Sequence, residues 1–186
     1  MKLINGLNKF SAKKAQQGLT LIEASMVLAL SAVVIAGAVM YYNSASESNK
    51  IQRAQGLLGS IQSAVQSNYA TRTNYTGLAV NEITFSAAIP RSFLYGSGVS
   101  AKIINPWGGD VLLEAGKAPS TTYVVTYQGI PPSACVSMAN VDLGNSMVGL
   151  KIGGNDMTIE GLTGAQVGAA CNAATDRTID VAWEFK

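Results

Sequence analysis

The stretch KKAQQGLTLIEASMVLAL, residues 13–30, places a carboxylate, Glu23, at the edge of a segment that otherwise has the composition of a membrane helix. Residues 24–46 carry no charge and are mostly apolar. As a helix they would extend roughly 34 Å at 1.5 Å per residue, enough to cross a hydrocarbon core of about 30 Å. A charge beside such a segment is costly in a bilayer, so we expect Glu23 to serve a function and to have a partner.

The charges at the N-terminus predict how this segment is oriented. Four lysines and no acidic residue precede Glu23, and the chain beyond residue 18 has nine basic against 11 acidic side chains. Basic residues before an apolar segment place residues 1–18 in the cytoplasm and the remainder outside it. The remainder has no cluster of Lys and Arg of the kind that binds nucleic acid. The sequence therefore predicts an exported protein without a nucleic-acid partner.

Two cysteines, Cys135 and Cys171, agree with an exported protein. An even number of cysteines in that setting predicts a disulfide, and the alternative is two buried free thiols. The bridge would contribute about 3 to 4 kcal/mol of stability in the chain-entropy model. The chain has no His and no CxxC, so we expect neither a metal site nor a cofactor.

Catalytic motifs are not evident. Without His, a conventional triad or general base is missing, and the cysteines are expected to pair with each other. Residues 96–98, Gly-Ser-Gly, lack the spacing of a nucleophile elbow. The sequence GGND at 153–156 is typical of a solvated turn more than of a calcium loop. We therefore expect no enzymatic activity.

Helical periodicity continues well beyond the membrane-length segment. No proline occurs before Pro90, and the helical spacing predicts one face that packs on a globular head. Gly37, Gly56 and Gly59 each weaken a helix by about 1 kcal/mol relative to Ala. Close packing is the favoured explanation for Gly37, whereas close packing and local melting both stay open for the other two. The apolar positions at steps of three or four are Ile51, Ala54, Leu58, Ile61, Val65 and Tyr69.

After Asn74 the pattern changes to turns and short strands. β-branched and aromatic residues alternate in part, as expected of an antiparallel sheet with one buried face. Two short helices are predicted at 134–141 and 163–174, and each would hold one cysteine. The predicted strands are 111–114, 123–128, 147–152 and 178–185.

The sequence GLTLIE, residues 18–23, resembles the cleavage motif of type IV prepilins. In that family a basic leader ends in Gly, the next residue becomes the new N-terminus, and a Glu stands at the fifth mature position. The resemblance implies cleavage between Gly18 and Leu19 by a prepilin peptidase and N-methylation of Leu19. A leader of 18 residues followed by Leu is similar to the type IVb subclass.

Further patches are similar to the major subunits of bundle-forming pili and of the thin pili of some conjugative plasmids. They are VLALSAVVIAGAVMYYNSASESNK (27–50), INPWGGDV (104–111), ACVSMANVDLG (134–144) and AACN (169–172). The resemblance implies the α+β ladle fold of type IV pilins: a long N-terminal helix packed against an antiparallel sheet, with a disulfide-bounded C-terminal region. It divides the chain into a leader (1–18), an apolar membrane and filament-core segment (19–46) and a head (47–186).

The resemblance also implies a function and partners. The subunit would wait in the inner membrane and then join an extracellular homopolymer used for adhesion, aggregation or conjugative contact. In that polymer Glu23 would pair with the Leu19 amine of a neighbouring subunit and set the axial register. The implied partners are other copies of the chain, the prepilin peptidase, the inner-membrane assembly machinery, and a tip adhesin or minor pilin.

Three other interpretations compete with the major pilin. A pseudopilin of a type II secretion system shares the cleavage motif but generally lacks the C-terminal disulfide. A membrane-anchored periplasmic binding module would not need Glu23. A conventional signal peptide cleaved near Ala36-Gly37-Ala38 is disfavoured, because the apolar segment continues past that point.

Overall fold

The computed structural model describes residues 20–173 and 177–186. The chain divides into two compact units, one ending at Asn43 and one formed by Ser44–Lys186. Helix α1 spans Leu21–Tyr69. The described part of the first unit, residues 20–43, contains the N-terminal part of this helix. The second unit is the head, which contains the rest of α1 and the sheet.

Helix α1 has 49 residues, as the absence of proline predicts. Within the head one face of α1 is buried and its exposed side is polar, for example at Gln52 and Ser63. The predicted apolar face is confirmed from Ala54 onward, and Leu57 and Ala64 complete it at helical spacing. The buried residues of α1 are Ala54, Leu57, Leu58, Ile61, Ala64, Val65 and Tyr69.

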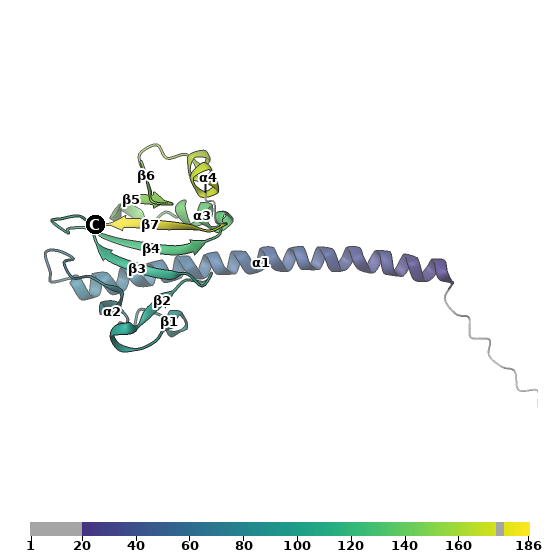
Figure 1. The fold of residues 1–186 in the computed structure, drawn as a ribbon, viewed down its shortest axis with the longest axis horizontal. Helices are drawn as coiled ribbons and strands as arrows, with labels where there is room; N and C mark the ends of the chain where they lie inside the picture. The colour runs from purple at the N-terminus through teal and green to yellow at the C-terminus, as the bar shows by residue number, and fades with distance from the viewer. Residues whose placement is uncertain (1–19, 174–176) are drawn as a thin grey trace, which may run out of the picture. The chain divides into compact units, whose positions relative to one another are not determined.

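A seven-stranded antiparallel sheet lies along this part of α1 (Figure 1). Its order is β1-β2-β3-β4-β7-β5-β6, so the C-terminal strand lies in the interior of the sheet, between β4 and β5. Register places buried side chains opposite one another, such as Leu113, Val125 and Trp183 in one row across β3, β4 and β7. The strands are β1 (Leu94–Tyr95), β2 (Lys102–Ile104), β3 (Asp110–Ala115), β4 (Tyr123–Ile130), β5 (Met147–Ile152), β6 (Asn155–Met157) and β7 (Ile179–Phe185).

Short helices fill the connections of the head. The two predicted helices are confirmed as α3 (Pro132–Ala139) and α4 (Gly164–Asn172). Helix α3 begins with a proline, whose missing N–H costs nothing at that position. Helix α4 begins with a capping box between Thr163 and Gln166. The sequence did not predict α2 (Val80–Ile83) or the 3-10 turns η1 (Arg91–Phe93), η2 (Gly98–Ser100) and η3 (Gly144–Ser146).

The four predicted strands are β3, β4, β5 and β7, whereas β1, β2 and β6 were not predicted. Each unpredicted strand is at most three residues long and shows too little alternation to detect. The GGND sequence forms the end of a hairpin. Gly153 and Gly154 have positive φ values of 58° and 82° and make its turn, and Asn155 begins β6.

Candidate functional site

The first unit exposes an apolar helical surface. Leu21, Leu28 and Met40 are 90%, 71% and 75% exposed, and their apolar neighbours in the same part of α1 are similar. A soluble monomer rarely leaves so much contiguous apolar surface in water. Helix α1 is also long and apolar enough to cross a membrane. This part of α1 therefore needs apolar surroundings, either a bilayer or other helices.

The two serines on this surface are satisfied within the helix. The Ser25 hydroxyl donates to the Ile22 carbonyl at 2.8 Å, and the Ser31 hydroxyl donates to the Val27 carbonyl at 2.7 Å. A serine hydroxyl that donates to a carbonyl of the preceding turn does not need a hydrogen bond from water. The serines are therefore compatible with a hydrocarbon environment or with a dry contact between helices.

Glu23 lies in the first turn of α1 and takes part in a capping box with Thr20. The Thr20 backbone N–H and hydroxyl both donate to Glu23 Oε2 at 2.9 Å, and the Glu23 N–H donates to Thr20 Oγ1 at 3.3 Å. This arrangement satisfies amide donors that the start of a helix otherwise leaves unpaired. This capping role was not predicted from the sequence, although Thr-x-x-Glu before an apolar segment is the recognisable signal of a capping box.

The carboxylate of Glu23 is nevertheless exposed and has no basic partner within the described residues. Gly18 and Leu19, the predicted cleavage residues, lie outside the described residues. Because Leu19 is not among the described residues, the pairing between Glu23 and a Leu19 amine stays a prediction. Thr20 fixes one oxygen of Glu23, which holds the carboxylate at the N-terminal end of the apolar surface.

The predicted disulfide joins Cys135 of α3 to Cys171 of α4. The two Cα atoms are 5.8 Å apart, and both residues are fully buried. The bridge spans a sequence separation of 36 residues that includes β5 and β6. It therefore links α3 to α4 and closes the segment that contains β5 and β6, and neither cysteine is available as a nucleophile.

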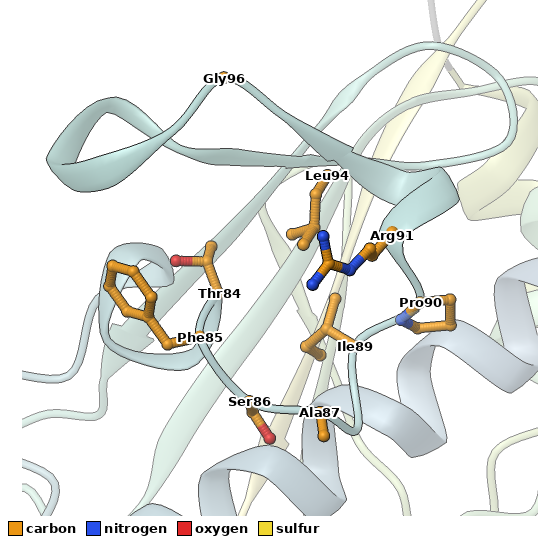
Figure 2. Close-up of a pocket in the computed structure, with 9 residues that line it drawn as sticks. All are labelled: Thr84, Phe85, Ser86, Ala87, Ile89, Pro90, Arg91, Leu94 and Gly96. Atoms are coloured by element: carbon orange, nitrogen blue, oxygen red, sulfur yellow. The ribbon is translucent and has the colours of Figure 1, made fainter.

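An open surface pocket of about 710 Å³ lies between the segment after α2 and strand β1 (Figure 2). Arg91 extends into it, with Ile89 and Leu94 beside it and Phe85 on the opposite wall. Among the residues that line this pocket there is no His, Cys or carboxylate. A guanidinium and two hydroxyls without a base do not form a set for acid–base or nucleophilic catalysis.

A family model described as Bundlin matches residues 43–186, and one described as the prokaryotic N-terminal methylation motif matches residues 13–39. The major structural subunit of bundle-forming pilus from Escherichia coli O127:H6 (strain E2348/69) is 37% identical over 97% of this chain and 100% of its own length. The chain belongs to the bundlin family and is a type IVb pilin. The bundlin match covers the whole head, including the strands and both cysteines.

A further relative and a solved structure are also similar to this chain. The corresponding subunit from Escherichia coli O111:H- is 41% identical over 77% of this chain and 74% of its own length. The crystal structure of a type IVb pilin from Salmonella typhi aligns with a TM-score of 0.56 at 21% identity, covering 73% of this chain and 97% of that chain. The latter similarity shows that the α+β pilin fold is shared.

Family membership identifies the chain as a structural subunit. Type IVb pilins are structural subunits that associate into a pilus, and the N-terminal methylation motif implies processing by a prepilin peptidase. The exposed surface of residues 21–43 overlaps the matched methylation motif at residues 21–39. The pseudopilin and the binding module are not favoured by these comparisons.

Proposed function

We propose that this pilin is the major subunit of a type IVb pilus and polymerises through the apolar part of α1. The observation that carries the proposal is the exposed surface of residues 21–43, of which residues 21–39 lie within the matched methylation motif. Helices with such a surface bury it against one another once they leave the bilayer. The relatives named as major structural subunits of bundle-forming pilus support the same role.

Processing would convert the membrane precursor into an assembly-competent subunit. Cleavage between Gly18 and Leu19 removes the basic leader and creates a positive amine, which N-methylation of Leu19 retains. The new amine stands four residues before Glu23, at the end of the apolar surface. The leader (1–18), the apolar segment (19–46) and the head (47–186) would then have separate roles in retention, polymerisation and display.

Glu23 would give the polymer its register. In a dry bundle of helices an unpaired carboxylate is strongly unfavourable, whereas pairing with the Leu19 amine of a neighbouring subunit makes its burial tolerable. The capping box supports this role, because Thr20 occupies only one of the two carboxylate oxygens. Glu23 Oε1 accepts no hydrogen bond from the described residues and stays available to a partner.

The assembled filament would be extracellular and would serve adhesion, aggregation or conjugative contact. The inner membrane would hold the precursor, and the pilus assembly machinery would extract it. A tip adhesin or minor pilin would complete the filament. The head, Ser44–Lys186, is the part of the chain that such a filament would present to its surroundings.

The test is mass spectrometry of subunits from sheared surface fibres, combined with substitution of Gly18. The wild-type subunit should begin at a methylated Leu19. Gly18→Arg should leave a precursor heavier by residues 1–18 and no fibres, whereas Gly18→Ala serves as the small-residue control. A mature mass unchanged in Gly18→Arg would overturn the assigned cleavage site. Absence of fibres that contain the wild-type chain would overturn the function.

A further inference from the structure

The sequence INPWGGD, which no role has yet explained, folds into a rigid loop around Asn105. The Asn105 side chain is 3% exposed and accepts hydrogen bonds from the backbone N–H groups of Trp107 and Gly109 at 2.9 and 3.1 Å. Its amide nitrogen donates to the Gln128 carbonyl of β4 at 2.7 Å. A buried amide with all these partners fixes the loop relative to the sheet.

This loop presents Trp107 to α1. The Trp107 ring packs against the edge of the core, and its Nε1–H donates to Glu47 Oε1 at 3.1 Å. Both side chains are only partly exposed. A hydrogen bond to a carboxylate is stronger than one between neutral groups, and partial burial limits competition from water.

A second hydrogen bond reaches α1 from the same part of the sheet. Tyr127, the residue before Gln128 in β4, donates its hydroxyl to the Ala54 carbonyl at 3.1 Å. Burial raises the pKa of Tyr127 well above its usual value, so the phenol remains a donor at any physiological pH. Glu47 and Ala54 are seven residues apart, which is about two turns and therefore the same face of α1.

Between these two points α1 has two other contacts with the head. Ile51 is partly buried against the core, and the Arg53 guanidinium lies 5.1 Å from the centre of the Phe93 ring. Ala54 is the first fully buried residue of the helix, and Gly56 and Gly59, which follow closely, each lower the local helical propensity by about 1 kcal/mol relative to Ala. The Glu47 hydrogen bond therefore extends the attachment of α1 by about one further turn, from Ile51 back to Glu47.

We propose that Trp107 and Glu47 are positioning residues for assembly, forming a clasp that holds residues 47–54 of α1 in helical register on the head. The clasp rests on the proposed function for its purpose, since it would connect the displayed head firmly to the helix that polymerises. Without it, residues 44–50 open locally and α1 is attached to the head only from Ile51 onward. The loop around Asn105 provides the rigid support for this contact.

The clasp is tested in the full chain, unassembled in detergent micelles, by hydrogen–deuterium exchange of α1 peptides. Trp107→Phe keeps an aromatic ring but removes the donor, and Glu47→Ala removes the acceptor. Both should speed exchange of residues 44–53 about ten- to a hundredfold, the loss expected for a hydrogen bond to a charged group, and leave residues 57–69 unchanged. Glu47→Gln keeps an acceptor oxygen and should give a smaller increase. Ser48→Ala, at an exposed neighbouring position, is the control.

Two results would overturn the clasp. One is wild-type exchange of residues 44–53 in both Trp107→Phe and Glu47→Ala. The other is equal acceleration throughout α1, which would mean that Trp107 acts through core packing alone. If Trp107→Phe does not fold, Glu47→Ala still decides, because it leaves the core intact.

The shear resistance of fibres distinguishes failure of the clasp from failure of the proposed function. When wild-type fibres form, we expect Trp107→Phe fibres to break at lower shear than Ser48→Ala fibres. Equal shear resistance would remove the assigned role in assembly, although the exchange result would still establish the contact. If no wild-type fibres form, the polymer function itself fails, while the exchange experiment still decides whether the clasp exists.

Discussion

At the scale of a single residue, Glu23 has one role in the structure and a second that we propose. Its side chain caps α1 through Thr20, and its charge would pair with the amine of a neighbouring subunit. Glutamine can replace glutamate in a capping box, because both have an acceptor oxygen, but it carries no charge. Substitution of Glu23 can therefore distinguish a local helix cap from an intersubunit partner.

We expect Glu23→Ala and Glu23→Gln to be inserted and cleaved normally, since losing the charge improves the membrane segment. Both should nevertheless give few fibres, because the buried Leu19 amine loses its partner at a cost of about 3 to 5 kcal/mol. Thr20→Ala, which loses the cap but keeps the charge, is the matched control and should still assemble. The measurement is the ratio of sheared fibre to membrane-pool subunit by immunoblot. Wild-type behaviour of Glu23→Gln would mean that capping alone explains this residue.

Residue-scale roles differ in how well the sequence predicts them. The capping box has a local signal, Thr-x-x-Glu, and was overlooked because the cleavage motif explained the same glutamate. The contact between Trp107 and Glu47 has no such signal, because the partners lie 60 residues apart and meet only when the loop around Asn105 has folded. The disulfide was predicted because only two cysteines were present.

At the scale of elements, α1 and the longer strands followed directly from periodicity. The missed strands β1, β2 and β6 form by pairing with longer neighbours, since two or three residues have no intrinsic preference strong enough to specify a strand. Likewise, the interior position of β7 depends on contacts with β4 and β5 that no local pattern specifies.

The glycines of α1 allow a test of its intrinsic stability. A Cβ at Gly56 or Gly59 would have no atom within 4 Å, and both positions are exposed. Alanine should therefore raise the free energy of unfolding by about 0.5 to 1 kcal/mol at each site. Chemical denaturation of the unassembled subunit measures this change. Gly109→Ala is the contrasting control, because its Cβ would overlap the Gln128 carbonyl and should destabilise the head.

Reduced stability from either alanine would contradict this account of the helix. Fibre yield then addresses why glycine occurs here. More stable subunits with normal fibres would mean that neither glycine is needed for assembly. More stable subunits with few fibres would place these glycines at a contact with another subunit or in a segment that must open.

The disulfide should stabilise the C-terminal part of the head. Replacing Cys135 and Cys171 together by alanine should lower the free energy of unfolding by about 3 to 4 kcal/mol, out of a typical total of 5 to 15 kcal/mol. We therefore expect low subunit levels and no fibres. Denaturation curves of the oxidised and reduced wild-type protein provide a comparison without mutation. Identical curves would show that the bridge adds nothing to stability.

At the scale of the whole molecule, the chain combines a head that buries its own core with a helix in which no residue from 21 to 53 is fully buried. The head buries its apolar side chains between its sheet and α1 from Ala54 onward, and the disulfide cross-links it. The apolar side chains of residues 21–43 can be buried only in lipid or against other copies of the chain. This division fits the proposed function, in which the chain is held in a membrane before assembly and joins an extracellular filament afterwards.

The most direct test is a cryo-electron microscopy reconstruction of wild-type fibres sheared from producing cells. We expect residues 21–43 of successive subunits to form the filament core. We also expect a Glu23 carboxylate to lie within hydrogen-bond distance of the Leu19 amine of a neighbouring subunit, with no residue before Leu19 present. Fibres whose core is built from the heads, or in which every Glu23 contacts only its own Thr20, would contradict the proposed function of α1 and Glu23.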